Sequence, residues 1–370
     1  MAVQSMSLSR KALLIVAVAA CSGSLIAFVH FENRRNRADG GMELSIGTAL
    51  NLKPPVGLPF VPVPHDNPVT AEKTALGRKL FYDKRLSFND TVSCASCHNP
   101  LLGFADGRSR SVGAGGKTGV RNAPSIMNAA YNSLLFWDGR AASLEAQVGI
   151  PMEDPIEMNQ PHAVTVSKIS TDPLYKQQFA SAFGPGPITM DKIEKALASF
   201  ERTLLSGNSP FDRYEYGGDK TALSPAALRG LAIFKDPQRG NCAACHTIGK
   251  DYALFTDGKF HNTGEGVNGE GELIDLGRYN QTKVEADKGA FKTPSLRNVA
   301  ESAPYMHDGS LKTLSDVVDF YAGGGNSNPY LDKNIKALDL SEHDRADLVE
   351  FLKSLSGPLP ENIGPPQGQK

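Results

Sequence analysis

Two copies of one five-residue motif constrain this sequence more than any other feature. Cys-x-x-Cys-His occurs at 94–98 and again at 242–246, and it uses four of the five cysteines in the 370 residues. Covalent attachment of a c-type haem requires two thiols about one helical turn apart, followed directly by an imidazole. A zinc site would need paired motifs about 15–20 residues apart, and a thioredoxin-like site would need a βαβ context that the sequence lacks. We therefore expect two covalently bound haems, held by Cys94, Cys97, His98, Cys242, Cys245 and His246, with both histidines as iron ligands.

A longer internal repeat surrounds these motifs. Pro-Ser-x-x-Asn at 124–128 recurs at 294–298, an offset of 170, and the same offset relates Asp138 to Asp308 and Leu144 to Leu314. The motifs themselves are offset by 148, so the second half has 22 more residues between its motif and its Pro-Ser turn. The repeat predicts a duplicated cytochrome-c-like unit with one haem in each domain.

Most recognisable elements between these landmarks are helical. Ser224-Pro225 combines an N-cap with a proline in the first turn, Ser341 is placed to cap another helix, and the segment 191–206 carries apolar residues on one face. We expect a mainly α fold with long loops. The predicted domains are an N-terminal haem domain over 61–215 and a C-terminal haem domain over 216–356.

Composition and charge exclude several classes of protein. Lys and Arg number 39 against 40 Asp and Glu, which gives a net charge of −1 without the basic excess of a nucleic-acid binder. A hydrophobic content of 40% and a charged content of 21% are those of a globular chain, not of a disordered or polytopic membrane protein.

The N-terminal segment predicts targeting. Arg10 and Lys11 precede an apolar run that extends to about Phe31, which fits an export signal. At about 20 residues the run also fits an uncleaved membrane anchor, and Val-Ala-Ala-Cys ending at Cys21 resembles a lipidation site. We expect export to the periplasm, with tethering at the membrane or cleavage. The predicted segments are a signal or anchor at 1–37, a Pro/Gly-rich linker at 38–60 and a flexible tail at 357–370.

Further motifs join these into one resemblance. They are Arg-Asn-Ala-Pro-Ser at 121–125, Phe-Trp-Asp-Gly-Arg at 136–140, Pro-Ile-Glu-Met at 155–158 and Tyr-Met-His-Asp-Gly at 305–309. With the two Cys-x-x-Cys-His motifs, the chain resembles the bacterial di-haem cytochrome c peroxidase/MauG family over roughly 55–356. The resemblance implies peroxide chemistry at the N-terminal haem and an electron relay at the C-terminal haem.

The resemblance also implies a second iron ligand at the C-terminal haem. That ligand lies fourteen residues beyond His307, at Tyr321, where the peroxidase branch has Met and the MauG branch has Tyr. Met306 is the rival ligand. The position that corresponds to Tyr321 in the first half is Pro151, which has no side-chain donor, so we expect an open iron at the first haem. The loop 111–120 contains no histidine to close it, and His162 is expected at the surface.

The remaining site residues are carried over from the family. Glu157 is implied as the acid–base group, Gln147 as the residue that positions the ligand and Trp137 as the bridge between the haems. An apolar surround should raise the pKa of Glu157. A Ca²⁺ ion is implied at the side chain of Asn122 and the carbonyls of Ser302 and Pro304, which are oxygen ligands of the kind that calcium prefers.

These inferences predict a di-haem peroxidase. It would reduce hydrogen peroxide at the N-terminal haem, with electrons from a small cytochrome c or cupredoxin that pass through the C-terminal haem. The first alternative is MauG-like oxidation of a partner protein, and the second is a non-catalytic electron-transfer cytochrome. No nucleic-acid partner is expected. A membrane tether through the N-terminal segment and a homodimer are both compatible with the sequence.

Overall fold

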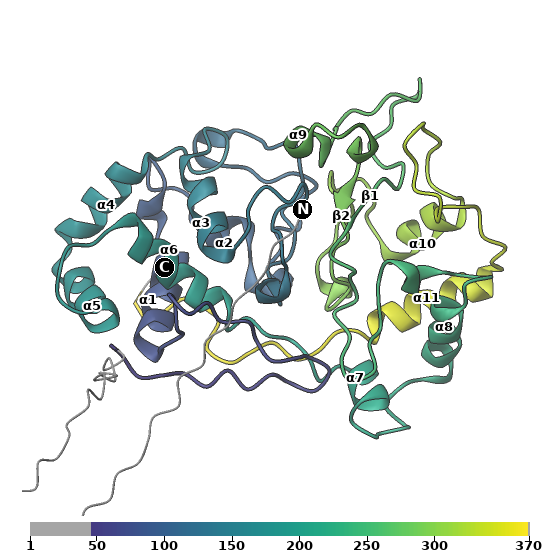
Figure 1. Ribbon diagram of the computed structural model, residues 1–370, viewed down its shortest axis with the longest axis horizontal. Coiled ribbons are helices and arrows are strands. Elements are labelled where there is room, and N and C mark those ends of the chain that lie inside the picture. Colours follow the sequence, from purple (N-terminus) through teal and green to yellow (C-terminus); the bar gives the residue numbers. More distant parts are fainter. Residues whose placement is uncertain (1–45, 369–370) are drawn as a thin grey trace, which may run out of the picture. The chain divides into compact units, whose positions relative to one another are not determined.

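The computed structural model describes residues 46–368, which belong to one compact unit. The predicted signal or anchor, including Cys21, lies outside the described residues. Within 46–368, the structure has no helix with the length and apolar character needed to cross a membrane. The described chain is mainly α-helical, as predicted, with one two-stranded antiparallel sheet (Figure 1). It has two hydrophobic cores.

The first core is built by helices α1 to α6, which we call the first lobe. Its centre is the crossing of α1 and α6, where Leu76, Phe81, Leu197 and Phe200 are at most 1% exposed. The helices are α1 (Ala71–Phe81), α2 (Cys94–Cys97), α3 (Leu144–Glu153), α4 (His162–Thr171), α5 (Pro173–Phe183) and α6 (Met190–Glu201).

The second core is built by α7, α8, α10 and α11. Together with α9 and the small sheet, these helices form what we call the second lobe. Here α8 crosses α11, with Phe234 and Phe351 at the centre. The elements are α7 (Pro210–Glu215), α8 (Pro225–Lys235), β1 (Phe260–His261), α9 (Tyr279–Thr282), β2 (Phe291–Lys292), α10 (Leu314–Ala322) and α11 (Glu342–Lys353).

The two lobes repeat each other down to single hydrogen bonds. Asn128 and Asn298 both have a positive φ, of 60° and 56°. The side-chain nitrogen of each donates at 3.0 Å to a carbonyl just beyond the last helix of its lobe, at Ser206 and at Gly357 respectively. The duplication inferred from the sequence is therefore present in the backbone.

The helix crossings are repeated as well. A Cβ added to Gly77 would lie 1.9 Å from the carbonyl oxygen of Ala196, and one added to Gly230 would lie 2.0 Å from that of Asp347. Only glycine allows α1 and α8 to approach their partners this closely.

The predicted helix starts are confirmed, and one predicted helix end is wrong. Ser224 and Ser341 cap α8 and α11 through their hydroxyls. The helix expected over 191–206 is α6, which ends at Glu201. Thr203 Oγ1 then bonds the carbonyl of Phe200 at 2.7 Å. Leu204, which follows, is still fully buried, so the apolar pattern extends beyond the end of the helix.

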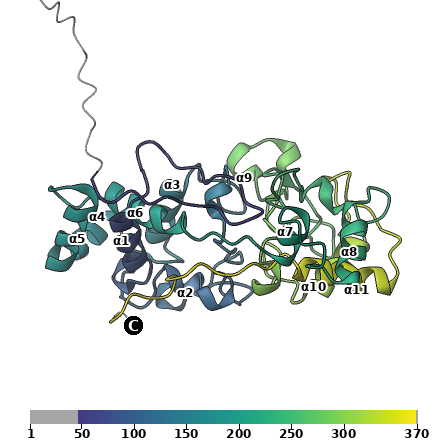
Figure 2. The ribbon, with the colours of Figure 1, turned by 90° about the horizontal axis from the view of Figure 1, so that it is seen from below.

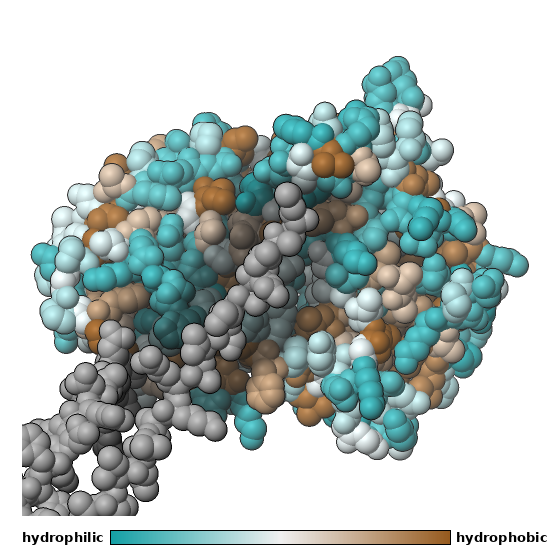
Figure 3. Space-filling model, viewed as in Figure 1, coloured by the Kyte–Doolittle hydropathy of each residue, from teal (hydrophilic) through white to brown (hydrophobic). Residues whose placement is uncertain are grey.

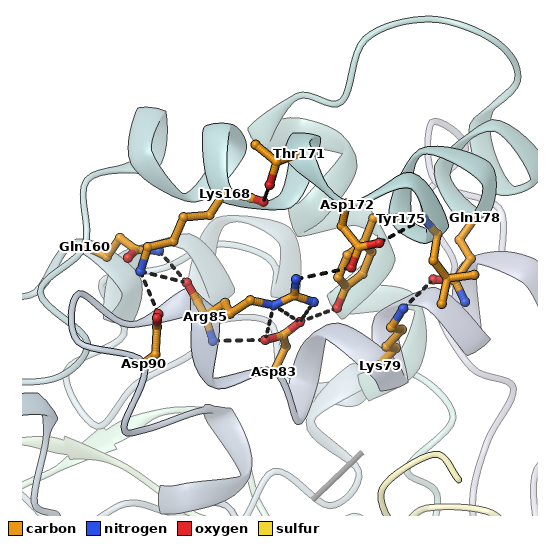
Figure 4. A network of polar contacts seen from close by, with 11 residues as sticks. Lys79, Asp83, Arg85, Asp90, Gln160, Lys168, Thr171, Asp172, Tyr175 and Gln178 are labelled. Carbon is orange, nitrogen blue, oxygen red and sulfur yellow. Dashed lines mark hydrogen bonds and ion pairs between the residues drawn. The ribbon is translucent and has the colours of Figure 1, made fainter. Parts of the chain in front are cut away.

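Helices α4 and α5 occur only in the first lobe, since the stretch between α10 and α11 contains no helix. A polar network holds them to the segment that follows α1 (Figure 4). Asp83 accepts bonds from Tyr175 Oη at 2.6 Å and from Arg85 at 2.8 Å, and Arg85 also bonds Asp172 at 3.2 Å. Nearby, Lys168 bonds Asp90 at 2.7 Å.

The predicted linker and tail both pack against the lobes. In the linker, the carbonyl of Gly57 accepts a 2.6 Å bond from Arg297, whose guanidinium also forms a fully buried pair with Asp212 at 2.9 Å. In the tail, the carbonyls of Ile363 and Gly364 accept bonds from α1 and its C-cap residue, so the C-terminal segment returns to the first lobe (Figure 2). The tail was predicted to be flexible, but these bonds order it up to that point.

Most of the face seen in Figure 3 is hydrophilic, with hydrophobic residues in small separate patches. Within residues 46–368, the most exposed large apolar side chains are Phe60, Leu101, Ile274 and Val120.

Candidate haem sites and the contact between them

The first motif forms a short helix with a fixed histidine. In α2, Ser96 Oγ accepts the backbone N–H of Ser93 at 2.9 Å, and the backbone N–H of His98 bonds the carbonyl of Cys94 at 2.9 Å. His98 Nδ1 lies 3.1 Å from the carbonyl of Phe104. A carbonyl can only accept, so Nδ1 carries the proton and Nε2 keeps its lone pair for a metal.

The second motif repeats this arrangement. His246 Nδ1 lies 2.9 Å from the carbonyl of Phe255, and burial lowers the pKa of both His98 and His246, which keeps the imidazoles neutral. All four thiols are free. Burial raises the pKa of Cys97 to about 11 and that of Cys242 to about 12. Paired free thiols beside a neutral imidazole fit the covalent attachment of haem.

A cavity opens above the second motif. Cys242, Cys245 and His246 line it together with Tyr321 and Met306, so both candidate iron ligands share the cavity with the proximal histidine. Burial raises the pKa of Tyr321 well above its usual value in the absence of a metal. Tyr321 as the iron ligand, with Met306 as its rival, stays a prediction.

The corresponding helix of the first lobe lacks such a donor. Leu144 begins α3 and Leu314 begins α10, so Pro151 and Tyr321 occupy the same position in their helices. Gln147 likewise corresponds to Val317, which lines the second cavity. This symmetry predicts that Gln147 lies over the first motif and that Pro151 leaves the ligand position there without a side-chain donor.

Glu157 is held by the loop 111–120. The backbone N–H of Ala114 donates to the carbonyl of Glu157 at 2.6 Å, and Lys117 Nζ bonds the carbonyl of Pro155 at 2.9 Å. A Cβ on Gly113 would collide with the carbonyls of Ile156 and Glu157, so only glycine fits there. Burial raises the pKa of the Glu157 carboxyl, as predicted, and the charge of Asp154 raises it further.

Trp137 lies where the lobes meet. Its indole N–H donates to the carbonyl of Asn122 at 2.9 Å, and its own carbonyl accepts the N–H of Lys292, on β2, at 2.8 Å. The backbone N–H of Asn122 donates to the backbone carbonyl of His307 at 2.7 Å. Trp137 also lines the second cavity, beside the stacked rings of Phe291 and His307.

The two Asp-Gly turns reach across this contact reciprocally. A Cβ on Gly139 would lie 2.4 Å from Phe260 of the second lobe, and one on Gly309 would lie 2.4 Å from Ser109 of the first. Arg121 bridges Asp138 at 2.8 Å and Asp275 at 2.7 Å, which adds charge pairing between the lobes.

Two other predicted positions are placed as follows. Asn122 is buried, and its side-chain nitrogen donates to the carbonyl of Arg108 at 2.8 Å. The side-chain oxygen, which is the predicted calcium ligand, takes no part in this bond. His162 is partly exposed, and its Nε2 lies 2.9 Å from the carbonyl of Gly149.

One histidine lies between two carboxylates, and no sequence motif pointed to it. His261, which lines the second cavity, has Nδ1 2.6 Å from Asp332 and Nε2 2.9 Å from Asp257. The donor atoms of Cys245, Asp257 and His261 lie within 4.8 Å of one another. No spacing rule could have found this group, because Asp332 is 71 residues away from His261.

Comparisons with known proteins agree with this geometry. The family model for di-haem cytochrome c peroxidase matches residues 71–221, and that for cytochrome c matches 227–356. The chain is 44% identical over 296 residues to the methylamine utilization protein MauG of Methylorubrum extorquens, which covers 80% of this chain and 81% of that protein. It is 36% identical over 312 residues to the cytochrome c551 peroxidase of Pseudomonas aeruginosa, covering 81% and 85%.

Two solved structures share the fold. A MauG-like protein associated with microbial copper homeostasis has a TM-score of 0.76 at 35% identity, over 85% of this chain and 97% of that one. The diheme peroxidase BthA from Burkholderia thailandensis has a TM-score of 0.66 at 26% identity, over 81% and 92%.

Proposed function

Since this chain belongs to the di-haem cytochrome c peroxidase/MauG family and is an oxidoreductase with two c-type haems, we propose that it reduces hydrogen peroxide at the haem held by the 94–98 motif. Electrons reach that haem from a small cytochrome c or cupredoxin through the haem held by the 242–246 motif. One observation carries the proposal: Tyr321 and Pro151 occupy equivalent positions, so a side chain can close the second iron while the first has no donor there.

Glu157 is the proton carrier of the reaction. A bound c-type haem supplies the iron that binds peroxide and the electrons that break its O–O bond. The carboxylate of Glu157 accepts the proton from the inner peroxide oxygen and returns it to the outer oxygen, which then leaves as water. Its raised pKa brings the carboxyl closer to the pH at which it must both accept and donate. Gln147 orients the peroxide by hydrogen bonding.

The loop 111–120 keeps Glu157 in place without a prior change of redox state. Its backbone already bonds the Glu157 carbonyl, and it carries no histidine that could close the first iron. We therefore expect the fully oxidised protein to react with peroxide directly. Trp137, bonded to both lobes, lies on the electron route between the haems.

Tyr321 favours a second candidate function. A phenolate is a hard anionic ligand, and the axial ligand is one of the groups that set the potential of a haem. Tyr321 would favour the ferric state of the second haem more than a methionine would. Such a haem suits the oxidation of a partner protein, as in the MauG branch, better than it suits storage of an electron from a high-potential donor.

Two further assignments complete the proposal. A Ca²⁺ ion would bind Asn122 Oδ1 and the carbonyls of Ser302 and Pro304, and the backbone bond from Asn122 to His307 holds Asn122 beside this turn. The N-terminal segment would direct the chain to the periplasm, where c-type haem is attached.

Peroxide turnover with a reduced donor tests the proposal. Haem-loaded, fully oxidised protein is mixed with hydrogen peroxide and a reduced small cytochrome c or cupredoxin, and donor oxidation is followed optically with and without pre-reduction of the enzyme. We expect turnover that needs no pre-reduction. Peroxide consumption without donor oxidation, together with mass changes on a partner protein, would favour the MauG-like function. A strict need for pre-reduction would refute the open first site.

A further inference from the structure

A carboxyl group is buried without a partner near the first motif. Glu201, in the last turn of α6, is 5% exposed, and its Oε2 has no hydrogen-bond partner among the residues that the structure describes. The adjacent Arg202 does not serve it, because both terminal nitrogens of Arg202 bond Glu145, at 2.6 and 2.9 Å. Burial raises the pKa of Glu201 to about 8. A buried polar group without a partner costs folding free energy, so its presence calls for a reason.

The second lobe shows that the fold does not need this carboxyl. Gly77 packs against Ala196 and Phe200, and Gly230 packs against Asp347 and Phe351, so positions 200 and 351 correspond. Glu201 therefore corresponds to Leu352, which is buried in the core of the second lobe. The same chain builds the same helix crossing once with leucine and once with glutamate. The carboxyl is thus specific to the lobe that carries the open haem site.

Glu201 lies close to the point where the first haem is attached. Cys94 packs against the first core beside α6, just as Cys242 packs against the second core, which contains Leu352. Burial raises the pKa of the Cys94 thiol, and the charges of Glu201 and of Glu157 raise it further. Cys94 forms one of the two thioethers to the haem in the proposed function. A change of charge on the haem would therefore act on Glu201 through a poorly screened, largely apolar interior.

The other titratable groups around this end of α6 have partners, although Arg202 Nε has no hydrogen-bond partner among the described residues. Arg202 and Glu145 of α3 form a bidentate pair, and Lys73 of α1 faces that pair. His162 of α4 faces Glu194, not Glu201. Glu201 is therefore the carboxyl here that can gain or lose a proton without breaking an ion pair. The nearby Cys94 thiol of α2 cannot do so once it has become a thioether to the haem.

We propose that Glu201 is a redox-linked proton site for the first haem. Where the pH lies above the pKa of Glu201 in the oxidised protein, the group is a carboxylate, and reduction of the haem by one electron from the donor would draw one proton from solvent onto it, which makes it a carboxylic acid. When the iron is oxidised again, the proton is released. Peroxide reduction consumes two protons with two electrons, so this coupling brings a proton to the site together with an electron. The inference rests on the proposed assignment of peroxide chemistry to the haem on the 94–98 motif.

Redox titration as a function of pH tests this inference. The reduction potential of the first haem is measured spectroelectrochemically in the haem-loaded full chain from pH 5 to pH 9, without peroxide. We expect the wild-type protein to take up close to one proton per electron in the part of this range where Glu201 titrates. Glu201→Gln and Glu201→Leu should remove that dependence, and Leu reproduces the residue at position 352.

A matched control separates Glu201 from other carboxyls of the same helix. Glu194 also lies on α6 and also has a pKa raised by burial, but it faces His162. Glu194→Gln should therefore keep the wild-type proton uptake. As a second readout, the infrared difference spectrum between oxidised and reduced protein should contain a protonated carboxyl band that Glu201→Gln removes. If Glu201→Leu does not load haem, Glu201→Gln still decides the question.

The outcomes distinguish this inference from the proposed function. Equal pH dependence in the wild type and in Glu201→Gln, with no change in the infrared band, would overturn the proton site even if peroxide turnover is normal. Loss of the dependence in Glu201→Gln would support the proton site even if no donor is oxidised with peroxide, in which case the proposed function alone would fail.

Discussion

Burial of Glu201 makes a quantitative prediction about stability, independent of any redox chemistry. The folded protein raises the pKa of this carboxyl from its ordinary value of 4.5 to about 8. Below pH 4.5 the group is protonated in both the folded and the unfolded chain, so it contributes no pH dependence. Between pH 4.5 and about 8 the unfolded chain releases the proton while the folded chain keeps it, so the free energy of unfolding falls as pH rises.

The size of the effect follows from that pKa. A tenfold difference in proton affinity corresponds to about 1.4 kcal/mol, so the full penalty amounts to roughly 5 kcal/mol above pH 8. Glu201→Leu and Glu201→Gln remove the titrating group. Relative to the wild type, each should therefore gain stability at about 1.4 kcal/mol per pH unit from pH 5 to pH 8, and the gain should then level off.

Urea unfolding at a series of pH values measures this difference. The wild type, Glu201→Gln and Glu201→Leu are compared in the same buffers, so that contributions from all other titrating groups cancel. The constant offset between the two variants reports their different packing and is not part of the prediction. A difference from wild type that does not change between pH 5 and pH 8 would refute the buried, unpartnered carboxyl.

Three further predictions concern the site and the fold. Glu157→Gln should lower kcat for peroxide reduction about 100- to 10,000-fold without lowering the melting temperature, because it removes a buried charge; a normal kcat would exclude Glu157 as the proton carrier. Asp212→Asn leaves the buried Arg297 without its partner and should cost about 3–5 kcal/mol in urea unfolding, whereas the exposed pair partner Asp319 should tolerate Asn with a loss below about 1 kcal/mol. Urea unfolding should show that Gly77→Ala lowers the free energy of unfolding by about 1–3 kcal/mol or more. Gly269→Ala should leave it unchanged, because a Cβ at that position has no atom within 4 Å.

The sequence predicted much of this structure because the constraints are local or repeated. The two Cys-x-x-Cys-His motifs predict haem attachment from five residues each. An offset of 170 residues relates turns that have the same backbone conformation in the structure, such as those at Asn128 and Asn298. Helix starts were predictable from Ser224 and Ser341, since an N-cap acts within its own first turn.

The remaining features depend on contacts that are distant along the chain. His261 is held by Asp332, 71 residues further along the chain, and the carbonyl of Gly57 in the linker accepts a bond from Arg297. The environment of Glu201 depends on how α6 crosses α1 and where Cys94 lies, which the sequence pattern alone does not give. Once the structure aligns α6 with α11, the comparison of Glu201 with Leu352 becomes visible.

The central claim is that the first haem has an open iron and that Tyr321 closes the second. Low-temperature electron paramagnetic resonance of the fully oxidised, haem-loaded protein tests it most directly, on the wild type and on Tyr321→Phe. The account predicts one high-spin and one low-spin ferric signal in the wild type, with only the low-spin signal altered in Tyr321→Phe. Two low-spin signals in the wild type, or a low-spin signal unchanged by Tyr321→Phe, would contradict it.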